Sequence, residues 1–97
     1  MASSKEYLHF VLDLLQGIEG ITYKKMMGEY LLYKDDVLFG GVYDDRFLIK
    51  KNESLSGLGL KEEIPYPGAK AMYLIDSDNP KTVEKIVDKA LAFYISA

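Results

Sequence analysis

The sequence contains no cysteine and a single histidine, His9. Without cysteine the chain has no disulfide, no thiol nucleophile and no cysteine-ligated zinc site. A lone histidine has no second imidazole with which to share a metal ion, and His9 stands between Leu8 and Phe10 in an apolar stretch. We therefore expect His9 to be a partly exposed or hydrogen-bonded helix residue rather than a metal ligand or a general base.

Long apolar runs and an excess of basic residues are also missing. No run approaches the roughly 18 apolar residues of a membrane span, and residues 1–6 lack the layout of a signal peptide, so we expect a cytoplasmic protein without a membrane partner. Twelve Lys and Arg against fifteen Asp and Glu give a net charge of −3, and the only arginine is Arg46. This balance argues against direct nucleic-acid binding, although the aromatic–basic run Tyr23-Lys24-Lys25 leaves a nucleic-acid-binding regulator as an alternative.

Motifs for catalysis are equally scarce. No serine lies in a Gly-x-Ser-x-Gly turn, and no phosphate-binding or dinucleotide-binding glycine motif occurs. The pairs Asp35-Asp36 and Asp44-Asp45 are predicted turns at opposite ends of one strand, about 20 Å apart and too distant to share one metal ion. We expect no enzyme activity, no catalytic residue, no metal and no cofactor; a small carboxylate- or lysine-based enzyme that binds a ligand or a metal is the other alternative.

The 97 residues, of which 48% are hydrophobic, predict one domain over residues 1–97. Ser3 and Glu6 fit a capping box, and Gly17 is the predicted stop of a first helix. Its apolar band is wide: Leu8, Val11, Leu12 and Leu15, extended by Tyr7, Phe10 and Leu14. So wide a band predicts a homodimer, because a large exposed apolar patch is rare on a monomer.

The middle of the chain changes to short aromatic and β-branched runs separated by glycine or aspartate pairs. These runs predict four strands at residues 21–27, 29–34, 37–43 and 46–50. The connections leave no room for crossover helices, so the strands should form an antiparallel meander.

The remainder of the chain predicts one more strand and a helix. Residues 51–70 are irregular, with one short helical turn near Ser54; residues 71–75 form a fifth strand; and Asn79 and Pro80 begin the last helix. That helix should bury Val83, Ile86, Val87, Ala90, Leu91 and Tyr94. The fold class is therefore α+β: two layers, with an antiparallel sheet of about five strands and helices at both ends of the chain.

Three segments carry a resemblance to a known family. They are Lys25-Met-Met-Gly-Glu-Tyr30, then Asp44-Asp-Arg46 with Lys50, and Pro67-Gly-Ala-Lys-Ala-Met72. In this order they resemble the N-terminal domain of the TfoX (Sxy) family, and the similarity covers essentially the whole chain. The family motif has Phe and a second Gly where this chain has Met27 and Glu29.

The resemblance implies a secretion-chaperone-like α+β fold and a stand-alone TfoX-like domain. TfoX proteins regulate natural competence in bacteria, promoting transcription of DNA-uptake genes together with the cyclic-AMP receptor protein, and they carry a second, C-terminal domain. The family offers no catalytic residue to transfer. The leading hypothesis is a non-enzymatic protein-interaction module with a regulatory role and an unidentified protein partner.

The residues predicted to serve that role are Lys25, Tyr30, Arg46 and Lys50. We expect them to border one recognition surface near Asp44-Asp45, where the charged ones form either an ion-pair network or a ligand patch. Exposed ion pairs contribute only about 0–1 kcal/mol each, so stability alone is a weak reason for them.

Three glycines are predicted to be structural. Gly28 should permit a tight turn or bulge between the first two strands. Gly40 and Gly41 should mark a turn, a bulge or a close backbone approach, rather than a phosphate cradle.

Overall fold

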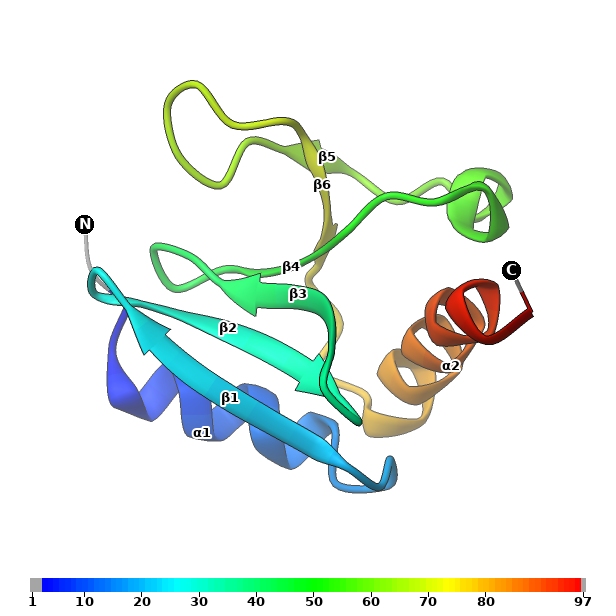
Figure 1. Ribbon diagram of the computed structural model, residues 1–97, viewed down its shortest axis with the longest axis horizontal. Helices are drawn as coiled ribbons and strands as arrows, with labels where there is room; N and C mark the ends of the chain where they lie inside the picture. The colour runs from blue at the N-terminus through cyan, green and yellow to red at the C-terminus, as the bar shows by residue number, and fades with distance from the viewer. Residues whose placement is uncertain (1–2, 97) are drawn as a thin grey trace.

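The computed structural model describes residues 3–96 and shows one antiparallel sheet with helices packed on it (Figure 1). The elements, in chain order, are α1 (Lys5–Leu14), β1 (Ile21–Met26), β2 (Glu29–Lys34), β3 (Val37–Val42), β4 (Phe47–Ile49), the 3₁₀ helix η1 (Glu53–Leu58), β5 (Glu62–Glu63), β6 (Met72–Ile75) and α2 (Pro80–Ser96). The expected α+β class, the four-stranded meander and the short helical turn near Ser54 are confirmed.

The sheet has six strands in the order β1-β2-β3-β4-β6-β5, so the expectation of about five missed one. The missed strand is β5, where Glu62 pairs with Tyr73 and Glu63 pairs with Met72. A segment of two charged residues lacks the alternation of apolar and polar side chains from which a strand is predicted. β5 exists because β6 offers a free edge to which it can pair.

Each hairpin of the meander closes through two residues with positive φ. The angles are 51° and 84° at Met27 and Gly28, 48° and 68° at Asp35-Asp36, and 51° and 54° at Asp44-Asp45. Turns of this handedness match the right-handed twist of the flanking strands. The predicted turn role of Gly28 is confirmed.

Gly40 and Gly41 lie inside β3 rather than in a turn, which corrects the turn alternative. The register between β2 and β3 shifts just before them, between Leu32 and Tyr33. A Cβ on Gly40 would lie 2.4 Å from the carbonyl oxygen of Leu48. The predicted bulge and close backbone approach therefore account for this pair of glycines.

The first helix begins one residue later and ends earlier than predicted. Its N-cap is Ser4, whose Oγ accepts a hydrogen bond from the Tyr7 amide at 3.1 Å, so Ser3 is not the cap. Ser3 is instead buried and bonded to Glu29. The helix ends at Leu14, before Gly17, and carbonyls of its last turn accept hydrogen bonds from the amides of Leu15 and Gln16.

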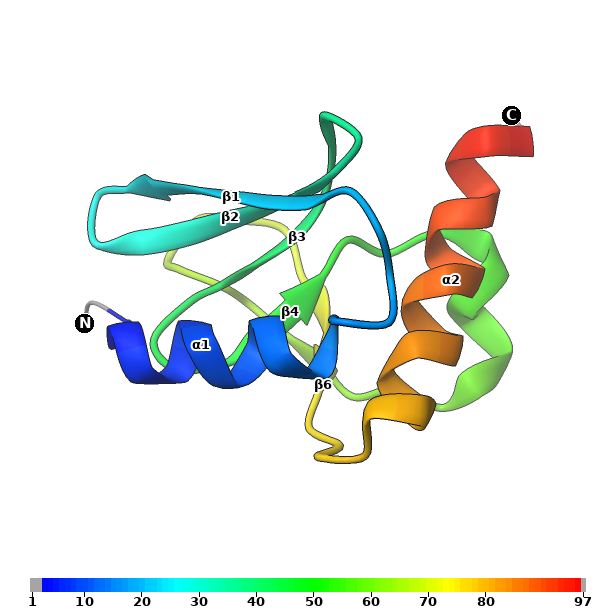
Figure 2. The same ribbon diagram turned by 90° about the horizontal axis from the view of Figure 1, so that it is seen from below.

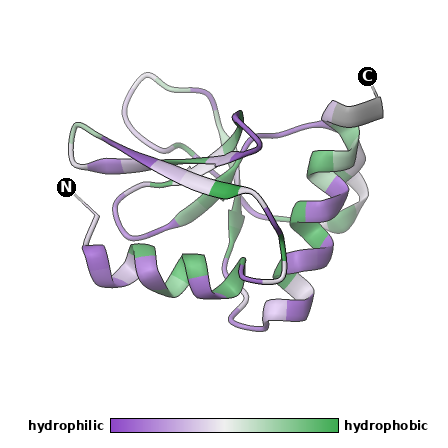
Figure 3. Ribbon diagram, turned by 60° about the horizontal axis from the view of Figure 1, so that its bottom comes forward, coloured by the Kyte–Doolittle hydropathy of each residue, from purple (hydrophilic) through white to green (hydrophobic). Residues whose placement is uncertain are grey.

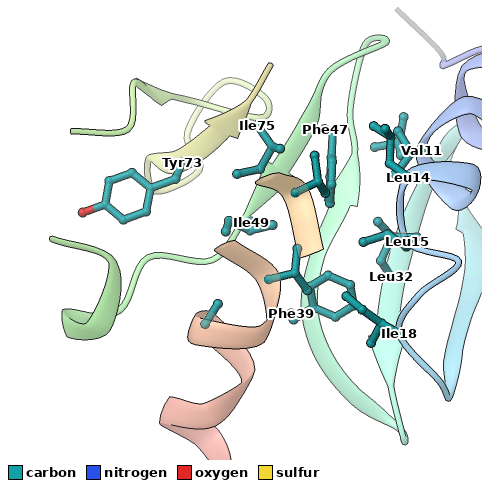
Figure 4. Close-up of a cluster of buried hydrophobic side chains, with 14 of the residues drawn as sticks. Val11, Leu14, Leu15, Ile18, Leu32, Phe39, Phe47, Ile49, Tyr73 and Ile75 are labelled. Carbon is teal, nitrogen blue, oxygen red and sulfur yellow. The ribbon is translucent and has the colours of Figure 1, made fainter. Parts of the chain in front are cut away.

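Both helices pack on the same face of the sheet and share one core with it (Figures 2 and 4). The wide apolar band of α1 is absorbed in this core: Leu8, Val11, Leu14 and Leu15 are buried, while Tyr7 and Leu12 pack against it. Only Phe10 stays largely exposed, at 43%. Most of the apolar band of α1, from which a homodimer was predicted, is thus buried within the chain itself.

The last helix begins as the sequence predicted. The Asn79 side chain accepts a hydrogen bond from the Lys81 amide at 2.9 Å, and Pro80 is the first helical residue. Hydrophobic and hydrophilic residues alternate along this helix (Figure 3), and four of the six predicted core residues are buried: Val83, Val87, Ala90 and Leu91. Ile86 and Tyr94 are partly buried against the same core.

The sheet face turned away from the helices has an apolar row of its own. Leu31, Gly41, Leu48 and Leu74 are direct neighbours across β2, β3, β4 and β6. Leu48 is fully buried although no helix covers this face. Within residues 3–96, no helix has the length and apolarity needed to cross a membrane.

Candidate functional site

Three connections meet at one end of the molecule: the β1–β2 turn, the β3–β4 turn and the loop between β5 and β6 (Figure 1). We call this region the loop end. Between these connections lies a cleft of about 430 Å³. Its lining residues are Glu29, Asp44, Arg46, Ile64, Pro65, Tyr66 and Pro67, and we call it the acidic cleft.

Arg46 fixes the loop that forms one wall of the cleft. Its Nη1 donates to Glu63 Oε1 at 2.7 Å and to the Ile64 carbonyl at 3.3 Å, and its Nη2 donates to the Pro65 carbonyl at 3.1 Å. Its Nε donates to the Tyr43 carbonyl at 3.1 Å. One half-buried guanidinium therefore joins the β3–β4 turn to the 64–65 segment with charge-assisted hydrogen bonds.

Glu29 ties the opposite wall together. Its Oε1 accepts from the Ser3 amide at 3.0 Å and from Ser3 Oγ at 2.7 Å. Its Oε2 accepts from the Asp44 amide at 3.1 Å. Next to it, Asp45 Oδ1 accepts from the Ser4 amide at 2.8 Å. The N-terminal segment is thereby bonded to both hairpin turns.

Among the charged groups that line the cleft, the carboxylate of Asp44 is the one that the fold does not use. It is exposed, and the structure of residues 3–96 gives it neither a hydrogen bond nor an ion pair. Glu29, Asp45 and Glu63 add three more carboxylates, against the single guanidinium of Arg46. Lys61 approaches Glu63 at 3.9 Å but is mostly solvent-exposed. With Lys70 of the β5–β6 loop included, four carboxylates stand against three cations at the loop end, and the cleft lining itself holds two carboxylates and one guanidinium. The cleft is therefore net negative.

Tyrosine rings form the aromatic part of the site. The rings of Tyr43 and Tyr66 are 6.2 Å apart; Tyr43 is 9% exposed and Tyr66 is 57% exposed. Burial raises the pKa of the Tyr43 hydroxyl above 10.0, and the neighbouring Tyr66, Glu29 and Tyr33 raise it further. The buried ring supports the exposed one, which leaves Tyr66 free to meet a ligand.

The loop end also holds the most exposed large hydrophobic side chains of the described residues. They are Met27 (96%), Tyr66 (57%), Ile64 (55%) and Met26 (52%). Every other such side chain is 44% exposed or less. A cluster of exposed apolar residues beside polar ones is typical of an interaction site on a soluble domain.

Of the four predicted site residues, the structure places only Arg46 in the cleft. Lys25 is exposed on β1, opposite Tyr30, which is buried on the helix-covered side. Lys50 lies beyond the other end of β4, with its Nζ 5.8 Å from the centre of the Tyr94 ring. Lys25 and Tyr30 are thus cross-strand neighbours, but Arg46 and Lys50 lie apart from them and from each other, and Arg46 pairs with Glu63 rather than with the neighbouring aspartates.

Other sequence candidates also lie outside the cleft. His9 is exposed on α1, as expected. Tyr23, Lys24 and Lys25 are exposed on β1, an edge strand of the sheet. Among residues 3–96 no group of three His, Cys, Asp or Glu side chains is placed to hold a metal ion.

The acidic cleft could not be predicted from the sequence because its walls come from three distant segments. In the sequence, Ile64-Pro-Tyr-Pro67 belongs to an irregular stretch and Glu29 is a departure from the family motif. The one pattern in the sequence that could have indicated this site is the apolar and aromatic tetrapeptide itself, because loops are usually built from polar turn residues.

Comparison with known proteins identifies the family. The model of the TfoX N-terminal domain matches residues 13–94. The chain belongs to the TfoX N-terminal domain family. A Spirochaeta aurantia protein, described as an uncharacterized 12.7 kDa protein in the trpE 5′ region, is 35% identical over 78 residues, which cover 78% of this chain and 68% of that protein.

The three segments that resemble the TfoX family converge at the acidic cleft. Glu29 comes from the first segment, Asp44 and Arg46 from the second, and Pro67 from the third. Residues far apart in the sequence thus form one surface, and the cleft is the strongest candidate for the functional site of this TfoX-like domain.

Proposed function

We propose that this TfoX-like domain is a non-enzymatic protein-interaction module that acts in transcriptional regulation in the cytoplasm, with natural competence as the process that the family name points to. The observation that carries the proposal is the loop end, which holds the four most exposed large hydrophobic side chains of the described residues: Ile64 and Tyr66 line the acidic cleft, and Met26 and Met27 lie at the neighbouring β1–β2 turn. Apolar anchors around a polar centre are the usual composition of a protein-binding surface.

The loop end is also held in place before any partner arrives. Arg46 secures the 64–65 segment, and Glu29 secures the N-terminal segment and the β3–β4 turn. A surface that is already ordered loses less conformational entropy on binding. These bonds give the two residues a positioning role in the proposed interaction.

The same bonds favour binding over catalysis. Both Glu29 oxygens accept hydrogen bonds from the fold, and Arg46 is paired with Glu63. Asp44 is left as the available carboxylate of the cleft lining, and one exposed carboxylate lacks the second positioned group that acid–base or nucleophilic chemistry requires. This arrangement supports the proposal of a module that holds a neighbouring molecule.

Affinity capture from native cells tests the proposal. Tagged wild-type protein is compared with the double variant Ile64→Ala/Tyr66→Ala and with Leu58→Ala, a matched control at an exposed leucine of η1. We expect wild type and Leu58→Ala to enrich the same proteins, with transcription factors or their regulators among them, and the double variant to lose these proteins. Equal enrichment by all three forms, or no specific enrichment by wild type, contradicts the proposal.

Direct nucleic-acid binding is the second candidate function, and the exposed run Tyr23-Lys24-Lys25 on the edge strand β1 favours it. Such binding would depend on phosphate contacts and would be strongest at low salt. Our proposal predicts no mobility shift of DNA or RNA at about 50 mM salt. A shift that disappears in Lys24→Ala/Lys25→Ala would establish the alternative.

A further inference from the structure

We propose, building on the function proposed above, that the acidic cleft receives a lysine or arginine side chain from an extended segment of the partner protein. Asp44 would accept the charged head group, and the exposed apolar side chains around it would pack against the stem and the neighbouring residues of the segment. The inference thus names the chemistry of the partner, which the proposed function alone leaves open.

The charges of the cleft favour a cation. Asp44 has no partner in the described structure, whereas the positive charge of Arg46 is compensated by Glu63 at 2.7 Å. Glu29 and Asp45 add negative charge beside it while bonded to neutral amide and hydroxyl groups. A partner carboxylate or phosphate would meet this negative field with a single N–H of Arg46 left to match it, because the other four N–H groups donate within the fold. A basic side chain would complement the field.

The walls of the cleft fit the rest of a basic side chain. Ile64, Pro65, Tyr66 and Pro67 present apolar surface on which a lysine or arginine stem can lie while its charged end reaches Asp44. The exposed ring of Tyr66 also offers a face to the cation. A bare metal ion would gain nothing from these walls, because metal ions bind through oxygen, nitrogen or sulfur ligands.

The apolar residues beyond the cleft indicate a segment rather than a free amine. Met26 is the cross-strand partner of Glu29, so it lies on the same sheet face as a carboxylate of the cleft. Met27 follows it at the tip of the hairpin, fully in solvent. A single amine would fill only the cleft, whereas a peptide with apolar residues beside its basic residue can cover Met26, Ile64 and Tyr66 together.

An NMR titration of ¹⁵N-labelled protein tests the inference. The probes are capped nonapeptides of alternating glycine and serine with a central residue flanked by two leucines, the centre being lysine, arginine, glutamine or glutamate. We expect the lysine and arginine peptides to shift the amides of Asp44, Ile64 and Tyr66, and to bind up to about fivefold more tightly than the glutamine peptide, as a partly exposed charge pair would produce. The glutamate peptide should bind most weakly.

Two substitutions with matched geometry provide the control. Asp44→Asn removes the charge, and Asp36→Asn makes the same change in the β2–β3 turn at the opposite end of β3. Both sites have positive φ, which asparagine tolerates, so both variants should fold. We expect Asp44→Asn to remove the preference for lysine over glutamine and Asp36→Asn to keep it.

The outcomes separate the two proposals. Lysine and arginine peptides that leave the cleft amides unmoved, or that bind no more tightly than glutamine, overturn the basic-side-chain inference. If Ile64→Ala/Tyr66→Ala still loses the native partner while Asp44→Asn keeps it, the interaction module stands and the inference fails. If neither variant affects capture of the native partner, the proposed function fails as well.

Discussion

The ring of Tyr43 lies directly over Gly41, two residues earlier in the same chain. A Cβ on Gly41 would be 2.7 Å from Tyr43 Cε2 and 2.6 Å from the carbonyl oxygen of Tyr30. Gly41 therefore allows the tyrosine ring to fold back across the sheet face that the helices leave open. There the ring meets Tyr66 and supports the wall of the acidic cleft.

Gly41→Ala should destabilise the protein, because the added methyl group collides with both a ring and a backbone oxygen. We expect the free energy of unfolding to fall by about 1–3 kcal/mol, as for other overpacked sites. Gly57→Ala is the control, since a Cβ there meets nothing within 4 Å. Urea unfolding of both variants measures the difference, and equal stabilities would show that the Tyr43 ring does not require Gly41.

Arg46→Lys should loosen the loop around the cleft. A lysine keeps the charge but cannot make the forked contacts to Glu63, Ile64 and Pro65, so we expect a loss of about 1–3 kcal/mol and faster amide exchange in the 64–69 loop. The control is Lys51→Gln, which breaks the exposed ion pair with the neighbouring Glu62 and should leave the free energy of unfolding nearly unchanged. Equal exchange rates in wild type and Arg46→Lys would contradict the positioning role of Arg46.

Stability should fall at high pH partly through Tyr43. Its folded-state pKa is raised above 10.0 by burial and by nearby Tyr66 and Glu29, so the folded protein holds this proton more tightly than the unfolded chain. The corresponding stabilisation is fully present below the unfolded pKa and is lost as the pH rises through the folded one. Urea unfolding between about pH 9 and pH 11 should show a smaller loss for Tyr43→Phe than for wild type. Tyr7, whose pKa burial also raises, keeps its own share of the loss in both proteins.

Met27→Asn should stabilise the fold. Met27 has a φ of 51° and is 96% exposed, so it occupies a conformation that favours Asn or Gly while burying almost nothing. Asn-Gly is the preferred pair for a turn of this kind, and we expect a gain of about 0.5–1 kcal/mol in thermal or urea unfolding. The same change should weaken partner capture, because it removes the most exposed apolar side chain of the loop end. A variant that is more stable and binds equally well would exclude Met27 from the proposed interface.

Much of the fold could be predicted because its signals are local. Aspartate pairs between apolar runs mark the hairpins, and Asn79-Pro80 marks the start of α2. The errors have non-local causes. β5 is held by its pairing with β6. Ser3 is not the N-cap of α1 because its side chain is hydrogen-bonded to Glu29, which is distant in sequence.

The site could be predicted only in part for the same reason. Arg46 was identified, but its partner Glu63 comes from a strand that the sequence did not reveal. Lys25 and Lys50 were grouped with Arg46 because all three lie in the segments that resemble the family. In the structure, the alternation of side chains along the strands places Lys25 on a different face of the sheet from Arg46, and Lys50 lies at the other end of β4. The acidic cleft depends on three loops meeting in space, which no local pattern specifies.

The most direct test of the loop end as the binding surface is hydrogen–deuterium exchange of the domain with and without its captured native partner. We predict that the partner slows exchange in three segments, 26–29, 43–46 and 63–69, and leaves the β2–β3 turn at 35–36 unchanged. Slowed exchange confined to the edge strand β1 or to α1, with the three segments unaffected, would contradict this interface.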